Sequence, residues 1–210
     1  GIIPGLTIPQ KRDLSRILSS LKEDMYRGLG PFDWSHVKDA ILKDDNIKQN
    51  SKFPLMGWID DLMSYNLFAR TDMPAVSELI KPGTLTILDF SDIVNMKKKQ
   101  MIVSYFANKL FDERKSNVIP PTLLIVEEAH QWCPQMASEE SAISRSILRT
   151  IAREGRKFGM SLCIISQRPV QLDTTTLSQC STHLILRITN PNDLKHIAES
   201  SEGIDQRSFG

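Results

Sequence analysis

Four short apolar runs in the second part of the chain constrain its fold more than any other feature. Each is rich in Leu, Ile and Val, is bounded by turn residues and has the length of a buried strand; the runs are 84–90, 122–126, 161–166 and 183–188. Helical segments alternate with them, at about 92–113, 139–156 and 174–179. Alternating strands and helices form a parallel sheet flanked by helices. The sequence therefore predicts an α/β fold.

The first part of the chain contains helical signals and no strand-like run. Apolar residues from Leu14 to Met25 recur at helical spacing, Asp33 can cap a second helix, and a third apolar stretch covers residues 53–68. We therefore predict a small all-helical unit over residues 1–78, followed by an α/β unit over residues 79–210.

Composition excludes several classes of protein. The net charge is +1 and neither end is a charged tail, so any nucleic-acid contact must come from a local patch. Lys97-Lys98-Lys99 is a weak signal of this kind and more often a solvated turn. No apolar run is long enough to span a membrane and no signal peptide is visible, so we expect a cytoplasmic protein with reduced cysteines. His130 and Cys133 lack the second ligand pair that a zinc site needs.

Polar residues follow two of the predicted strands, at the edge of a parallel sheet where ligands bind. Glu127 and Glu128 come directly after the run 122–126, and Gln167 follows the run 161–166. In nucleotide hydrolases the first such acid holds Mg²⁺ and the second polarises the attacking water. If the two strands are neighbours, Gln167 lies beside Glu128 and can orient that water. The alternative is a pair of solvated loop acids and a loop glutamine that bonds backbone.

The helix between these strands carries two stripes of side chains. One is apolar, and roughly opposite to it lies a row of arginines: Arg145, Arg149, Arg153 and Arg156. Such a row usually faces solvent, and this is the expectation for Arg145 and Arg149. Arg153 and Arg156 lie where the helix leads into the next strand, where a guanidinium can reach the phosphate of a neighbouring subunit.

Taken in order, these segments resemble the HerA-type DNA translocases of the FtsK/HerA branch of RecA-like ATPases, the archaeal members most closely. The resemblance covers roughly residues 83–204 and rests on four blocks: Leu123-Leu-Ile-Val-Glu-Glu-Ala-His130, Arg153-Glu-Gly-Arg-Lys-Phe-Gly-Met160, Ile165-Ser-Gln-Arg-Pro169 and Leu186-Arg-Ile-Thr-Asn-Pro191. It implies a RecA-like core, and it makes the helices of residues 8–75 an insertion that precedes this part of the core.

The resemblance also implies a function and a set of site residues. It implies a homohexameric ring on double-stranded DNA that binds ATP and Mg²⁺ between subunits and resects broken ends with a NurA-type nuclease. Glu127 then matches the metal-side acid, Glu128 the catalytic glutamate and Gln167 the sensor. Either Arg153, which we favour, or Arg156 matches the finger that reaches the neighbouring subunit. Arg187 lies in a family motif without an assignable role.

Two departures from the family pattern affect this interpretation. Glu127 stands where aspartate is commoner, and no G-x-x-x-x-G-K-[ST] phosphate-binding loop occurs in the chain. We therefore expect a fragment, cut at both ends and inactive alone, whose phosphate-binding loop lies upstream of Gly1. The alternatives are a conjugation or packaging ATPase of the same superfamily, or a non-catalytic pseudo-ATPase that acts as an interaction module. A DEAH-box helicase is disfavoured because its companion motifs are absent.

Overall fold

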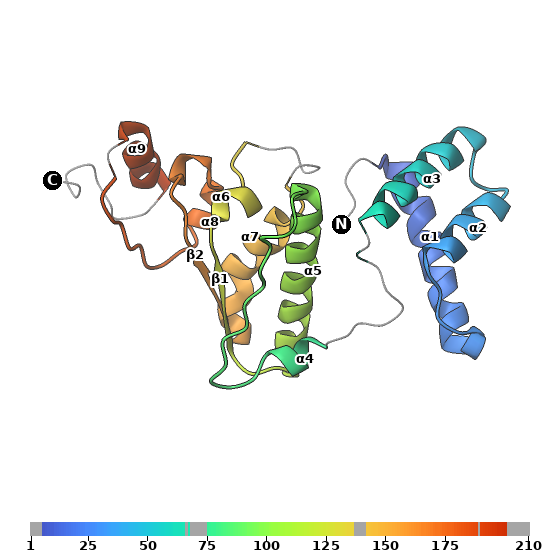
Figure 1. Ribbon diagram of the computed structural model, residues 1–210, viewed down its shortest axis with the longest axis horizontal. Coiled ribbons are helices and arrows are strands. Elements are labelled where there is room, and N and C mark those ends of the chain that lie inside the picture. Colours follow the sequence, from blue (N-terminus) through green and yellow to red (C-terminus); the bar gives the residue numbers. More distant parts are fainter. Residues whose placement is uncertain (1–5, 66, 68–74, 137–141, 189, 201–210) are drawn as a thin grey trace. The chain divides into compact units, whose positions relative to one another are not determined.

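The computed structural model describes residues 6–65, 67, 75–136, 142–188 and 190–200 (Figure 1). The chain divides into two compact units. The first, within Gly5–Met73, is the helical unit. The second, within Pro74–Gly210, is the α/β unit.

The described residues of the helical unit form three α-helices, α1 (Ile8–Asp24), α2 (Trp34–Lys43) and α3 (Gln49–Ser64), with a π-helical turn, η1 (Met25–Leu29), after α1. Gly28 bends the chain there with φ 92°, a left-handed conformation that glycine adopts without strain. Asp33 caps α2 as predicted, because its carboxylate accepts hydrogen bonds from the backbone N–H groups of Ser35 and His36. Asn66 and Phe68, at the end of the predicted third helix, lie outside the described residues.

The apolar faces of these helices form one core. Its buried side chains come from all three helices and include Leu14, Ile17, Val37, Ile41, Leu55 and Ile59. Around the core, Arg16 pairs with Asp44 at 2.6 Å and Lys38 pairs with Asp60 at 2.6 Å. The helical character predicted for the first part of the chain is confirmed.

The α/β unit alternates helices and strands, as predicted. Its elements are α4 (Val76–Leu79), α5 (Met96–Lys115), β1 (Thr122–Val126), α6 (Ala129–Trp132), α7 (Arg145–Glu154), η2 (Gly155–Phe158), β2 (Met160–Ile164), η3 (Pro169–Gln171), α8 (Thr174–Leu177) and α9 (Pro191–Ser200). Of the helix predicted at 139–156, the part Arg145–Glu154 is confirmed as an α-helix. Residues 142–144 are not helical, and residues 139–141 lie outside the described part of the chain. No helix within the described residues is long and apolar enough to cross a membrane.

The two strands β1 and β2 pair in parallel, with Thr122 opposite Met160 and Val126 opposite Ile164. The pairing continues past the strands, since Ile165 N–H donates to the Val126 carbonyl and Ala129 N–H donates to the Ile165 carbonyl, both at 2.9 Å. The predicted α/β fold, a parallel sheet flanked by helices, is therefore confirmed, and the carboxyl ends of both strands lie at one edge.

Two of the four predicted strands do not form in the described residues. Residues 84–90 and 183–188 have no partner in a hydrogen-bonded ladder, although their sequences favour strands. Leu85 is 79% exposed and Leu184 is 93% exposed, so neither run is buried as expected. A strand satisfies its backbone groups only through a neighbouring strand, and within the described part of the chain the ladder ends at β1 and β2.

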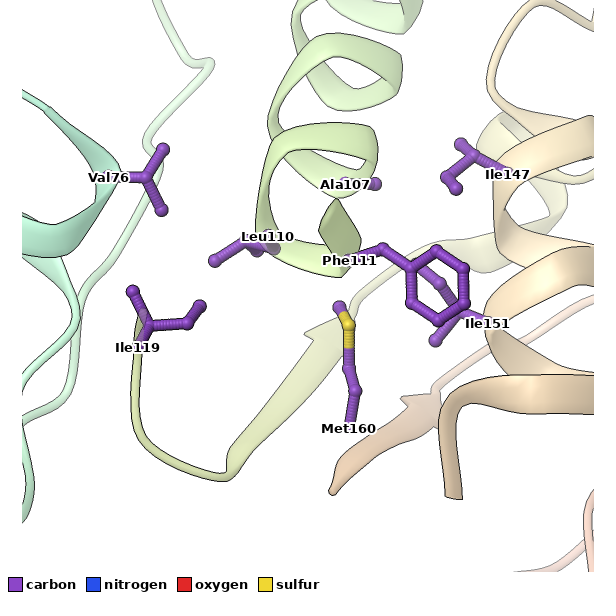
Figure 2. Close-up of a cluster of buried hydrophobic side chains, with 8 residues drawn as sticks. All are labelled: Val76, Ala107, Leu110, Phe111, Ile119, Ile147, Ile151 and Met160. Carbon is purple, nitrogen blue, oxygen red and sulfur yellow. The ribbon is translucent and has the colours of Figure 1, made fainter. Parts of the chain in front are cut away.

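Among the described residues, helices cover one face of the sheet, and side chains of the other face are about half exposed. α5 and α7 pack against the covered face around Phe111, Ile151 and Met160, and Figure 2 shows these side chains converging from the two helices and the start of β2. On the other face, Leu123 is 57% exposed and Ile125 is 49% exposed. The covered face supplies the apolar burial that fixes the strands, and so fixes the residues at their ends.

Candidate functional site

The site lies at the carboxyl edge of the two strands, where Glu127 and Glu128 leave β1. The Glu127 side chain is exposed, and its backbone carbonyl accepts a 2.7 Å hydrogen bond from Trp132 Nε1. Trp132 in turn packs on Phe90, with ring centroids 5.7 Å apart. A large aromatic anchor therefore fixes the backbone of the first acid and leaves its carboxylate open to solvent.

Glu128 has a left-handed backbone, with φ 50° and ψ 44°. A non-glycine residue in this region stores strain, which functional sites tolerate when the surroundings hold it. Here the turn is held by the hydrogen bond from Ala129 N–H to Ile165 across the sheet edge. The turn ends the strand abruptly and starts α6, and the Glu128 side chain lies toward the loop that follows β2.

Gln167 lies beside Glu128, as the sequence predicts. Its Nε2 donates to Glu128 Oε1 at 3.2 Å, from the loop between β2 and η3. Two polar side chains that are 39 positions apart in the sequence therefore meet, because parallel neighbouring strands end at the same edge. Their catalytic roles stay predictions.

The residues around the two acids suit Mg²⁺ that binds mainly through water and phosphate oxygens. Within the described residues no group of three or more His, Cys, Asp or Glu side chains could hold a metal ion. Mg²⁺ in nucleotide sites commonly uses only one or two carboxylates, together with the substrate's phosphates. The exposed Glu127 carboxylate fits this kind of binding, with Glu128 as its neighbour.

Arg153 and Arg156 are not brought to Glu128. Both are exposed and lie where α7 passes through η2 into the start of β2, so they occupy the amino edge of the sheet. A strand of five residues separates the two edges by about 13 Å at roughly 3.3 Å per residue. Within one chain these arginines and the acids therefore belong to different surfaces.

The expectation of a solvated face is wrong for Arg145 and Arg149. Arg145 Nη1 donates to the Pro134 carbonyl at 2.9 Å. Arg149 binds both oxygens of Asp173, through Nε at 3.0 Å and Nη2 at 2.5 Å. Helical periodicity predicted that these arginines share a face, but the partners on that face come from loops distant in the sequence.

Asp173, the partner of Arg149, also caps a helix. It caps α8, since its Oδ2 accepts from Thr176 N–H at 2.8 Å, and it is 1% exposed. Burial acts to raise the pKa of Asp173, but hydrogen bonds from Arg149 and Thr176 outweigh it and keep the pKa below its ordinary value.

The buried Cys133 belongs to the same network. Its Sγ lies 3.1 Å from Thr176 Oγ1, and its carbonyl accepts from Asp173 N–H at 2.9 Å. Burial raises the pKa of the Cys133 thiol to about 11, so the thiol stays protonated at neutral pH. Cys133 therefore packs as a small apolar residue.

Comparison with known proteins identifies relatives of this chain. It is 27% identical over 212 residues to the DNA double-strand break repair helicase HerA of Saccharolobus solfataricus, an alignment that covers 93% of the chain and 42% of that protein. It is 30% identical over 209 residues to the helicase of the same name from Pyrococcus furiosus, covering 82% of the chain and 37% of that protein. The chain is a relative of the HerA-type helicases.

A probable helicase of Methanocaldococcus jannaschii is 42% identical over 113 residues, covering 50% of the chain and 21% of that protein. The chain thus spans about a fifth to two fifths of the length of these HerA-type and helicase relatives. No family model matches it.

Sequence reasoning did not include His130 and Ser166 in the site. His130 Nδ1 lies 3.4 Å from Glu128 Oε2 and 3.0 Å from Ser166 Oγ. Both residues stand inside the HerA-like blocks: His130 comes two positions after Glu128, and Ser166 directly precedes Gln167. The signal was therefore present, but only the parallel pairing of β1 and β2 shows that the two blocks touch.

Proposed function

We propose that this chain is the acid-bearing half of the ATP site of a HerA-type DNA translocase or helicase. The observation that carries the proposal is the Glu128 carboxylate, held by Gln167 at the carboxyl edge of two parallel strands and beside the exposed Glu127. The names of its relatives, DNA double-strand break repair helicases, support an action on DNA.

Each residue at this edge has a task in the proposed reaction. The substrate is ATP bound to Mg²⁺, and the bond hydrolysed is a phosphoanhydride bond of ATP. Glu127 binds the Mg²⁺ ion through its solvent-exposed carboxylate. Glu128 accepts a hydrogen bond from the attacking water and orients it. Gln167 holds Oε1 of Glu128 and offers its remaining amide groups to the phosphate side.

The proposal extends to the whole protein of which the chain is a part. That protein forms a homohexamer around double-stranded DNA in the cytoplasm, and it resects broken ends with a NurA-type nuclease. Arg153, or else Arg156, reaches the nucleotide of the neighbouring subunit. The exposure of both guanidiniums at the amino edge supports contact with another subunit.

A substitution at Glu128 tests the proposal. In the intact protein that contains this chain and a phosphate-binding loop, Glu128→Gln should lower ATP turnover by about 10² to 10⁴-fold, because the amide cannot polarise water as the carboxylate does. ATP binding should stay close to that of the wild type. Turnover by phosphate release and ATP binding by equilibrium titration give the two measurements.

The matched control is Glu199→Gln, which removes an exposed carboxylate that pairs with Lys195 on α9. It should leave turnover unchanged. The 210-residue chain alone should hydrolyse no ATP, since it has no phosphate-binding loop motif. Full turnover in Glu128→Gln would contradict the proposal, and an intact protein that does not bind ATP would favour the non-catalytic interaction module.

A further inference from the structure

His130 lies between the two loops that form the site. Its side chain is only 9% exposed, in contrast to 42% for Glu128. His130 is the second residue of α6, two positions after the left-handed Glu128. Its Nδ1 lies 3.0 Å from Ser166 Oγ in the loop after β2. The imidazole is therefore held by the same sheet edge that brings Gln167 to Glu128.

The neighbours of Nδ1 decide which tautomer fits. An ionised carboxylate can only accept hydrogen bonds, so the approach of Nδ1 to Glu128 Oε2 at 3.4 Å is favourable when Nδ1 carries the proton. Ser166 Oγ already accepts from Arg168 N–H at 3.0 Å and has a second lone pair for the same Nδ1 proton. A proton on Nδ1 can thus be donated to Ser166 Oγ, and it also attracts Glu128 Oε2, which lies 3.4 Å from Nδ1.

The two neighbours of Glu128 hold different oxygens of its carboxylate. Gln167 Nε2 is 3.2 Å from Oε1, and His130 Nδ1 is 3.4 Å from Oε2. The last side-chain torsion of glutamate is otherwise broad and rotates easily. Contacts to both oxygens fix the plane of the carboxylate, and they leave lone pairs free for a water molecule.

We propose that His130 is a positioning residue for Glu128. Its Nδ1–H, oriented by Ser166, holds the carboxylate at the angle from which it directs the attacking water. This inference rests on the proposed function, because it assigns His130 a part in Glu128-dependent hydrolysis. His130 itself does not touch the reacting atoms.

Substitutions that keep or remove a donor at the Nδ1 position separate this role from a packing role. In the intact protein with its phosphate-binding loop, His130→Ala should lower kcat by about 10- to 100-fold, the usual effect of a misplaced catalytic group. The KM for ATP should change little. His130→Asn places an amide N–H near the position of Nδ1 and should recover most of the lost kcat, whereas His130→Gln places it too far along the side chain and should not.

Two further variants complete the experiment. Ser166→Ala removes the group that orients the ring and should lower kcat by less than His130→Ala does, again without a change in KM. His36→Ala is the matched control, since its imidazole is exposed on α2 in the helical unit, and it should keep the wild-type kcat.

The outcomes distinguish this inference from the function on which it rests. If wild-type turnover does not depend on Glu128, the proposed function fails and the inference fails with it. If turnover depends on Glu128 but His130→Ala keeps the wild-type kcat, the inference alone is overturned. Equal loss in His130→Ala and His130→Asn, with a lowered melting temperature in both, would overturn it too, because it would show a packing role.

Discussion

Asp173 carries a buried charge that three groups compensate. Arg149 binds both of its oxygens, and the backbone N–H and hydroxyl of Thr176 each donate to Oδ2 at 2.8 Å. A buried charge is costly unless it is paired and hydrogen-bonded in this way. The pair joins α7 to α8 and thereby fixes the helix that bears Arg153.

We expect Asp173→Asn to lower the free energy of unfolding by about 3 kcal/mol at pH 7, because it removes the buried carboxylate that binds the Arg149 guanidinium. The pKa of Asp173 is lower in the folded than in the unfolded state, so its charge stabilises the fold above the unfolded pKa. That contribution is lost as the pH falls through the folded pKa. Urea unfolding at pH 7 and at about pH 3 should therefore show a smaller difference between variant and wild type at the lower pH.

The control for this prediction is Asp60→Asn, which removes one partner of an exposed ion pair. Exposed pairs contribute little, so its unfolding curve should stay close to that of the wild type. An equal loss for Asp173→Asn at both pH values would show that its charge is not the source of the stability.

At the scale of elements, the turn between α7 and β2 depends on Gly155. A Cβ added there would lie 2.4 Å from the Met160 carbonyl oxygen, a backbone atom at the start of β2 that cannot move aside. We expect Gly155→Ala to lower the free energy of unfolding by about 1–3 kcal/mol through this overlap. Chemical denaturation monitored by circular dichroism measures the change.

Gly57→Ala is the contrasting variant, because a Cβ there meets nothing within 4 Å in the interior of α3. Alanine is the better helix former, so this variant should gain about 0.5–1 kcal/mol. If Gly155→Ala were as stable as the wild type, the close packing of the turn on β2 would be refuted.

The sequence predicted the elements whose signals are local. The runs at β1 and β2 are short and apolar, their parallel pairing followed from the helix between them, and this placed Gln167 beside Glu128. The runs 84–90 and 183–188 have a similar composition. A strand also requires a neighbouring strand to pair with, and composition does not show whether one is present.

Side-chain partners distant in the sequence were beyond prediction for a related reason. Periodicity predicted that Arg145 and Arg149 lie on one helix face. It could not predict their partners on that face, which are a loop carbonyl and an aspartate. The contact between His130 and Ser166 was likewise not predictable, because it depends on the register of two strands.

At the scale of the whole molecule, the acids and the exposed arginines occupy opposite edges of the sheet. Glu128 follows the carboxyl end of β1, and Arg153 and Arg156 precede the amino end of β2. A complete site in the proposed ring therefore combines the acid edge of one subunit with an arginine from another.

Mixed rings test this arrangement. Subunits with Glu128→Gln and subunits with Arg153→Ala should each be inactive alone, and mixing them should restore part of the ATP turnover at interfaces that combine an intact glutamate with an intact arginine. The same mixture with Arg156→Ala decides which arginine acts. Recovery in neither mixture, at any ratio, would argue against an arginine that acts between subunits.

Position 128 combines a left-handed backbone, which favours glycine, with a carboxylate that the proposed activity requires. Glycine would adopt φ 50° and ψ 44° without the penalty of about 1–2 kcal/mol that an L-residue carries there. Glycine would also bring no carboxylate to the sheet edge. Glu128→Gly should therefore raise the thermal stability and abolish the turnover, so that selection for a more robust fold would remove the residue on which the proposed activity depends.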